Sequence, residues 1–478
     1  MQQATLGQPK GLSIFFLTEM WERYGFYIIE SLLVLYLIQK FTLSDDTSYA
    51  ILGSFTALAY ITPILGGYLA DNVLGHRQGV LAGGALLCIG YSLMAMANSS
   101  ITMSLALGII TMGTGLLKPN VSSLLGNLYT PTDSRRDSGF TLFYVGINMG
   151  ILLATCSGGY LVELIGWHNT FATAAVGLVL GTAVFYFGMQ YYVFKDFSPM
   201  SKSPVRIASA YFSIVLAALL SAYIIQHETF ALLCFLAVSI GTIVLVLYKA
   251  FQFPEKERNK ILAFLILVLI SIIFWAAYFQ LFFSLDLFVL RVVNHNLLGL
   301  YVPNSVFMGI EAFGVIAFGL VLGWFWTWLK NHSLDISTSM KFTMAMGLIT
   351  LAFGVLLLSL KITPQGQEVA SAWLILAYLL IAIAELALSP IGLAMVTELV
   401  PQSLVGMMMG IWFVSLGIGG KLAGLFADYS NIPFNMHQLS TIADVYKSAF
   451  SLYFSICLAA SLLVWMVAPF ITRLVKTL

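Results

Sequence analysis

The run GLSIFFLTEMWERYGFYIIESLLVLYLIQKF, residues 11–41, decides the fold class of this chain. It is long and apolar enough to cross a bilayer, whose hydrocarbon core of about 30 Å needs about 20 residues of helix. Inside it, however, EMWERYGFYIIE at 19–30 carries three glutamates and one arginine. An ionisable side chain at the centre of a membrane helix costs about 2.5–3.5 kcal/mol. These four charges therefore need a physical reason.

The composition of the whole chain points to a membrane protein. Of its 478 residues, 60% are hydrophobic and only 9% are charged, whereas soluble domains carry about 25% charged residues. The net charge of +1 and the absence of a basic stripe do not favour nucleic acid as a partner. We predict an all-α polytopic membrane protein.

Apolar runs along the chain predict fourteen transmembrane helices, with ends uncertain by about three residues. Twelve of them form two six-helix bundles, at 13–192 and 260–472, and a lipid-facing hairpin at 207–248 lies between the bundles. The predicted spans are 13–38, 48–71, 78–97, 101–125, 138–162, 170–192, 207–226, 229–248, 260–288, 300–329, 342–360, 370–399, 404–426 and 448–472.

Basic residues predict the orientation of these helices. With a cytoplasmic N-terminus, 15 of the 22 lysines and arginines fall in inside-facing segments and four in outside-facing segments. Short cytoplasmic loops carry such an excess, so both termini are predicted to be cytoplasmic. The first apolar run is too long and aromatic for a cleavable signal peptide.

The charges of the first span lie on one face of the helix. At about 100° per residue, Glu19, Glu22, Arg23, Tyr27 and Glu30 fall within an arc of about 140°. This spacing predicts one face that contacts water or other charges and an opposite face that contacts lipid or packed side chains.

Other ionisable side chains lie in later spans: Lys118, Asp286, Glu311, Glu385 and Lys421. A static salt bridge between Lys118 and Glu22 would explain one pair of them. Charges in both bundles instead favour a substrate or ion path, because buried ions in membranes are usually functional. Polar and aromatic residues nearby in the predicted spans are Tyr60, Asn148, Trp275, Asn304, Ser389 and Trp412.

The stretch GGYLADNVLGHR, residues 66–77, resembles a motif that major facilitator transporters carry between their second and third spans. Gly66 and Gly67 would permit close helix contact, and Asp71 could accept hydrogen bonds from a neighbouring helix N-terminus. An ordinary polar turn is the alternative explanation.

Several motifs together resemble the proton-dependent oligopeptide transporters of the major facilitator superfamily. Residues 19–27 are similar to the family's E-x-x-E-R-F-x-Y-Y signature. The further matches are LLKPN at 116–120, DSGFTLFYVGINMG at 137–150, FWAAYFQ at 274–280 and ELALSPIGLAMVTELVP at 385–401. The hairpin after the sixth span is typical of bacterial members.

This resemblance implies roles for individual residues. Glu19, Glu22, Arg23 and Lys118 would couple transport to protons. Lys118 would also hold the carboxylate of a peptide, and Glu385 would hold its amino group with help from Asn148 and Asn304. The remaining residues expected to line the substrate cavity are Tyr27, Glu30, Tyr60, Trp275, Ser389 and Trp412.

Three positions depart from the family pattern and resemble its atypical bacterial branch. Glu30 stands where many members have an arginine, Phe26 replaces a tyrosine, and Phe279 stands where many have an acid tied to proton coupling. Without a second cation at position 30, the inferred cavity holds two more acids than bases. This excess predicts a preference for dipeptides with cationic side chains.

The sequence therefore favours a monomeric proton-coupled symporter of the bacterial inner membrane that imports dipeptides and possibly tripeptides. A carrier for drugs, sugars or nitrate is the alternative within the same fold. An intramembrane enzyme is disfavoured, because no metal-binding pair and no nucleophile set lies in a span. A scaffold or receptor would not need ions in both bundles. Neither a cofactor nor a metal is expected, and the four cysteines fit small core residues.

Overall fold

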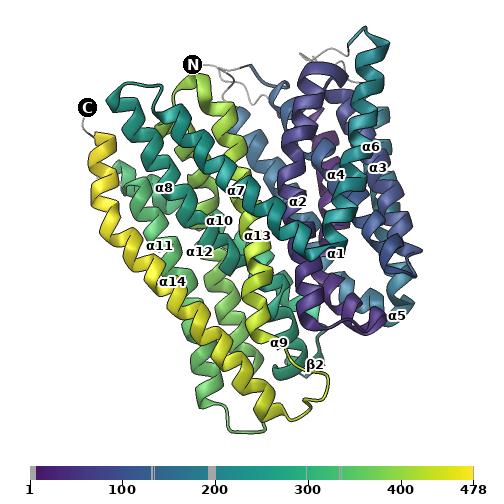
Figure 1. Ribbon diagram of the computed structural model, residues 1–478, viewed down its shortest axis with the longest axis vertical. Helices are drawn as coiled ribbons and strands as arrows, with labels where there is room; N and C mark the ends of the chain where they lie inside the picture. The colour runs from purple at the N-terminus through teal and green to yellow at the C-terminus, as the bar shows by residue number, and fades with distance from the viewer. Residues whose placement is uncertain are drawn as a thin grey trace. The chain divides into compact units, whose positions relative to one another are not determined.

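The computed structural model describes residues 7–476 except 131–132, 134, 192–200, 298, 333 and 335. Residue 192, where the first bundle is predicted to end, lies outside these ranges. The described chain is almost entirely helical (Figure 1). Its long helices are α1 (Leu12–Phe41), α2 (Asp45–Leu69), α3 (His76–Ala95), α4 (Ser100–Gly126), α5 (Arg136–Tyr191), α6 (Pro204–Gln226), α7 (Glu228–Ala250), α8 (Glu255–Tyr278), α10 (Asn304–Asn331), α11 (Thr338–Ile362), α12 (Ser371–Leu399), α13 (Val405–Ala427) and α14 (Leu439–Lys476).

Within the described ranges, 13 helical segments are long and apolar enough to cross a membrane. The predicted spans 138–162 and 170–192 share a single segment, because α5 continues through both. Gly166 interrupts its helical geometry with φ 77° and ψ 169°, a conformation that favours glycine. The fourteen predicted crossings therefore correspond to these 13 segments.

One predicted span is interrupted in the structure. The span at 260–288 breaks after α8 into the 3₁₀ turn η2 (Phe279–Phe282) and the short helix α9 (Ser284–Val292). The side chain of Gln280 joins the broken span to α13, with Nε2 donating to the carbonyls of Ala276 of α8 and Ala423 of α13 at 3.1 and 2.9 Å. Such side-chain bonds satisfy backbone groups that a broken membrane helix leaves without partners.

The span predicted at 300–329 begins later than expected. A two-stranded hairpin, β1 (Asn296–Leu297) and β2 (Leu300–Tyr301), precedes α10. Pro303 lies directly before the helix, and a proline disfavours helical geometry in the preceding residue, here Val302. The helix therefore starts at Asn304 rather than at residue 300.

The chain divides into two compact units. Unit 1 comprises Met1–Leu32 and Leu58–His227, and unit 2 comprises Leu33–Ala57 and Glu228–Leu478. Helices α1 and α2 each contribute residues to both units. The hairpin is also divided, since α6 belongs to unit 1 and α7 to unit 2. These bounds differ from the predicted bundle, hairpin and bundle at 13–192, 207–248 and 260–472.

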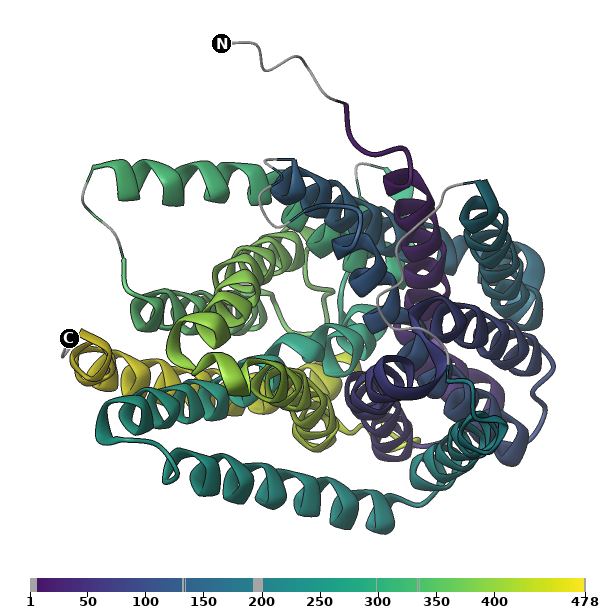
Figure 2. The same ribbon diagram turned by 90° about the horizontal axis from the view of Figure 1, so that it is seen from above.

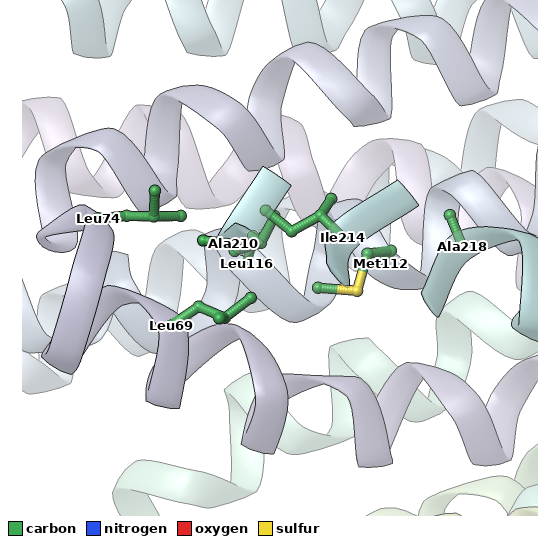
Figure 3. Close-up of a cluster of buried hydrophobic side chains, with 7 residues drawn as sticks. All are labelled: Leu69, Leu74, Met112, Leu116, Ala210, Ile214 and Ala218. Carbon is green, nitrogen blue, oxygen red and sulfur yellow. The ribbon is translucent and has the colours of Figure 1, made fainter. Parts of the chain in front are cut away.

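Helix α6 is more than a lipid-facing element, because one of its faces belongs to the core of unit 1. Figure 3 shows this core cluster, which joins α2, the π-helical turn η1 (Ala70–Leu74), α4 and α6. Ala218 of α6 packs so closely on α4 that a side chain at Gly108 would overlap its carbonyl. The other face of α6 exposes Phe212 and Leu216. The cluster consists of Leu69, Leu74, Met112, Leu116, Ala210, Ile214 and Ala218.

Glycines bring other helices of unit 1 together, as small residues do in membrane proteins. A Cβ at Gly66 would overlap the carbonyl of Gly115 on α4, which confirms the close contact predicted there. At Gly67 the nearest atom to a Cβ would be Cβ of Pro119 at 3.9 Å, so that position has room. Asp71 is exposed, with Oδ1 3.5 Å from Nε2 of His76, and its role as a latch stays a prediction.

In unit 2, α11 packs against both α12 and α14 (Figures 1 and 2). Phe353 of α11 lies 6.1 Å from the ring of Phe450 and 5.5 Å from that of Tyr453, both on α14. Helix α7 packs on α8 and α13 and buries Ala231 and Phe235. These contacts hold the helices that carry the polar residues described next.

Candidate functional site

The charges of α1 form one buried cluster in unit 1. Glu19, Glu22 and Arg23 have relative exposures of 1%, 0% and 3%. Nε of Arg23 lies 3.5 Å from Oε1 of Glu19 and forms a second ion pair with Oε2 of Glu22. Thr114 of α4 donates a hydrogen bond of 3.0 Å to the other oxygen of Glu22. One guanidinium thus serves two carboxylates, and the trio carries a formal charge of −1 when both acids are ionised.

Lys118 of α4 is a second cation near this cluster. Its Nζ lies 5.1 Å from the ring centroid of Tyr60, a cation–π distance. The ammonium interacts electrostatically with Glu19, Glu22 and Glu30. Among the described residues no carboxylate lies within 4.0 Å of it. The Lys118–Glu22 bridge that the sequence suggested is therefore not formed here, because Arg23 and Thr114 already contact that carboxylate.

The remaining predicted residues of unit 1 surround the cluster unequally. Tyr27 is half-buried and interacts electrostatically with Arg23, and Glu30 is buried. Asn148 of α5 donates its amide to the carbonyl of Tyr144 at 3.0 Å, one turn back in its own helix. The structure therefore brings Tyr27 and Glu30 to the charged cluster, whereas the Asn148 amide uses one of its two N–H groups within its own helix.

Two residues of this cluster escaped the sequence analysis. Thr114 precedes Lys118 by one helical turn, and this spacing was an available signal. Tyr91 of α3 is fully buried and packs against Gly25 of α1, and its hydroxyl interacts electrostatically with Glu22, Arg23 and Glu30. An apolar stretch containing one tyrosine offered no signal, since tyrosines in such stretches usually serve packing.

Unit 2 contains a separate group of acids. Glu311 on α10 and Glu385 on α12 lie side by side, within reach of a mutual hydrogen bond, where Gly314 of α10 packs against Ala382 of α12. Tyr278, the last residue of α8, donates to Oε1 of Glu311 at 3.4 Å. The structure thus places Glu385 beside a second acid, Glu311. The sequence had predicted Glu311 only as one more ionisable side chain in a membrane span.

Asn304 and Asp286 form the neighbouring polar contact. Nδ2 of Asn304 donates to Oδ1 of Asp286 at 3.0 Å and to the backbone carbonyl of Asp286 at 2.7 Å. These bonds join the start of α10 to α9. They leave Oδ1 of Asn304 without a hydrogen-bond partner in the described chain, so that atom is able to accept a bond from a ligand.

The three other predicted residues of unit 2 differ in their surroundings. Trp275 is buried on α8, and its ring lies 5.4 Å from that of Tyr278. Ser389 is half-buried and follows Glu385 by one turn. Trp412 of α13 packs so tightly that a side chain at Gly392 would overlap its ring. Trp412 therefore fills the contact between α12 and α13.

Lys421 also has a structural explanation. It is buried on α13, and its Nζ donates to Oγ of Ser54 at 3.2 Å and to the carbonyl of Ala50 at 3.4 Å. Both acceptors lie in the part of α2 that belongs to unit 2. Lys421 thus holds α2 against α13.

A cavity of about 800 Å³ lies in unit 1 at the C-terminal end of α4, lined by residues that include His76, Ser122, Asn127, Arg136 and Phe140. None of the predicted site residues lines it. The described part of the chain contains no group of three or more His, Cys, Asp or Glu side chains that could hold a metal ion.

Comparisons with known proteins agree with this arrangement. A family model described as the POT family matches residues 77–442. The chain is 30% identical to dipeptide and tripeptide permease B of Salmonella typhimurium, over 99% of this chain and 97% of that protein. It is 31% identical to dipeptide and tripeptide permease A of Chromobacterium violaceum, over 98% and 95% of the two chains.

Solved structures share the fold. A crystal structure of peptide transporter POT in complex with sulfate superposes with a TM-score of 0.87 at 29% identity, covering 99% of this chain and 97% of that one. A variant of peptide transporter POT in complex with alafosfalin gives the same values. These similarities confirm the predicted major facilitator architecture.

Proposed function

Since the chain belongs to the POT family, we propose that it is a proton-coupled symporter that imports dipeptides and tripeptides by alternating access. The buried cluster of Glu19, Glu22 and Arg23 beside Lys118 is the observation that carries this proposal. Such a cluster is costly in a membrane protein, and its pairing can change when a proton or an anion arrives.

In unit 1 the proposed ligand is the carboxylate of the peptide. Lys118 has no direct ion pair among the described residues, so its ammonium can bind that carboxylate with a charge-assisted hydrogen bond. A proton on Glu19 or Glu22 would weaken that acid's ion pair with Arg23. Arg23 could then interact with the peptide as well, which links peptide binding to protonation.

In unit 2 the proposed ligand is the amino group of the peptide. Glu385 supplies the negative charge, and Oδ1 of Asn304 is an additional acceptor. A peptide with both termini free carries a carboxylate and an ammonium group, whereas a sugar carries neither and a simple anion carries only negative charge. The charges found in each unit therefore favour peptides over other small solutes.

We place this multi-pass protein in the bacterial inner membrane, with both termini in the cytoplasm, acting as a monomer and without a cofactor. Proteoliposomes with an inward proton gradient test the proposal. Labelled dialanine should accumulate, unlabelled di- and tripeptides should compete, and alanine and glucose should not. Accumulation that is unaffected by collapsing the gradient, or competition by glucose, would contradict it.

A further inference from the structure

Glu311 and Glu385 lie within reach of a mutual hydrogen bond, and such a bond requires a proton. Ionised carboxylates only accept hydrogen bonds, so two carboxyl groups bond to each other only when one of them is protonated. Glu311 is 5% exposed, and two negative charges at such short range repel strongly in a buried site. The contact is therefore most favourable when the pair holds one shared proton and one negative charge.

The surroundings of the pair offer no alternative to that proton. The hydroxyl of Tyr278 of α8 lies within hydrogen-bonding reach of both carboxyl groups. Within the described chain, no lysine or arginine is among the groups that interact electrostatically with either of them. The other titratable group near Glu311 is Tyr378 of α12, which also interacts with Asp286 of α9. A buried second charge without a cation is strongly unfavourable.

The hydroxyl of Tyr378 provides an independent sign of a ligand. Tyr378 is fully buried, and its oxygen has no hydrogen-bond partner in the described chain. It interacts electrostatically with Glu311 and Asp286, so it belongs to the same polar region. Buried polar groups are rarely left without a partner, and this oxygen can accept a bond from a primary ammonium group.

We propose that Glu311 is a proton-binding residue of the transport cycle. Its protonated carboxyl group donates to Glu385, which stays ionised and binds the ammonium group of the peptide. This inference rests on the proposed function and extends it to a second proton site, in unit 2, besides the cluster on α1.

Charge balance explains why proton and peptide would travel together. With Glu311 neutral, the charge of −1 on Glu385 and the charge of +1 on the ammonium cancel, and the loaded half-site is neutral. Without the proton the loaded half-site carries −1, which is costly away from water. When the site opens to the cytoplasm, water solvates a second carboxylate, and the proton can leave after the peptide.

The substitution Glu311→Gln tests this role, because glutamine mimics the protonated carboxyl group but cannot release a proton. In proteoliposomes we expect gradient-driven accumulation of dialanine to fall by about tenfold or more. Counterflow, in which labelled and unlabelled peptide exchange without a gradient, should stay within about threefold of the parent rate. Glu311→Asp, which keeps a titratable group, should restore part of the accumulation.

Glu398→Gln is a matched control, since Glu398 is an exposed acid at the end of α12 that bonds to Thr338. It should accumulate peptide like the parent. Undiminished accumulation by Glu311→Gln would overturn the proposal, and so would equal loss of accumulation and counterflow, which indicates a structural role. A parent protein that transports no peptide would instead contradict the proposed function.

Discussion

At the residue scale, the two units differ in how the negative charge of their buried acids is balanced. In unit 1 the guanidinium of Arg23 is shared by Glu19 and Glu22, and Lys118 stays apart from both. In unit 2 the proton proposed between Glu311 and Glu385 would take the place of a cation. Each arrangement balances part of the buried negative charge of its unit. It also leaves one charged group, Lys118 in unit 1 and Glu385 in unit 2, able to bind a ligand.

Lys118→Gln should abolish gradient-driven uptake of dialanine. The substitution removes the proposed anchor for the peptide carboxylate and leaves Arg23 as the nearest cation to a cluster with excess negative charge. A charge-assisted hydrogen bond contributes about 1.5–3 kcal/mol, so uptake should fall by about tenfold or more. Lys256→Gln, at an exposed position in the first turn of α8, is the control, and a rate for Lys118→Gln within twofold of it would sink the assignment.

Glu385→Gln should weaken the binding of peptides with a free amino terminus far more than that of acetylated peptides. The lost charge-assisted bond is worth about 1.5–3 kcal/mol, and an acetylated terminus never forms it. Competition by dialanine and by N-acetyl-dialanine against one labelled peptide measures the difference. An equal loss for the two ligands would show that Glu385 only supports the structure.

Glu30 should shift substrate choice towards cationic dipeptides. Glu30 is buried on the polar face of α1 and interacts electrostatically with Lys118. Two charges about 8 Å apart interact by roughly 2 kcal/mol at an effective dielectric constant of 20, so a lysine side chain on the substrate gains directly. Competition by Ala-Lys, Ala-Ala and Ala-Glu should rank in that order for the parent, and Glu30→Gln should reduce the advantage of Ala-Lys over Ala-Ala. An undiminished advantage of Ala-Lys in the variant would refute the inference.

At the element scale, the helices of unit 1 approach each other through glycines, and one span of unit 2 that carries polar groups is interrupted. Gly146 and Gly150 of α5 lie against Phe16 and Met20 of α1, which brings α5 onto the helix with the charged cluster. The break between α8 and α9 places Tyr278 and Asp286 in different helices. An unbroken helix would be enough to cross the hydrocarbon core of the membrane. The break between α8 and α9 is what sets the positions of these two polar side chains.

Adjacent glycines allow a direct test of close helix packing. Gly66→Ala should lower the melting temperature of the purified protein in detergent, because its Cβ would overlap the carbonyl of Gly115 and overpacking costs about 1–3 kcal/mol. Gly67→Ala should leave it unchanged or slightly higher, since the nearest atom there lies 3.9 Å away. Similar shifts for both variants would contradict this account of the α2–α4 contact.

At the scale of the whole molecule, α1 and α2 contribute to both units, and polar bonds tie the start of α2 to unit 2. Asp45 accepts two bonds from the guanidinium of Arg291 at 2.6 and 2.7 Å and a third from the backbone N–H of Ile432 at 3.0 Å. Lys421 reinforces this attachment further along α2. Unit 2 is thus completed by a segment from the N-terminal part of the chain.

Asp45→Asn should destabilise the protein more than Asp46→Asn. Asp45 is buried, and removing one partner of a buried ion pair costs about 3–5 kcal/mol because the other charge stays behind. Asp46 is the exposed neighbour in the same helical turn and controls for helix charge. Thermal unfolding in detergent should show a lower melting temperature only for Asp45→Asn, and combining it with Arg291→Gln should cost less than the sum of the single changes. Simple additivity would mean that the pair contributes no coupling.

The sequence by itself determined the membrane class, the positions of most membrane-spanning helices and the family, because hydropathy, helix length and motifs such as residues 19–27 are properties of consecutive residues. It also identified most of the buried charges, since an ion in an apolar run is visible without a structure. Only the tertiary structure decided which groups meet. It paired Glu22 with Arg23 rather than Lys118, placed Glu311 against Glu385, and turned the amide of Asn304 to Asp286. These contacts depend on the rotation, depth and breaks of helices that are distant in sequence, and one residue of shift rotates a side chain by about 100° around the helix axis.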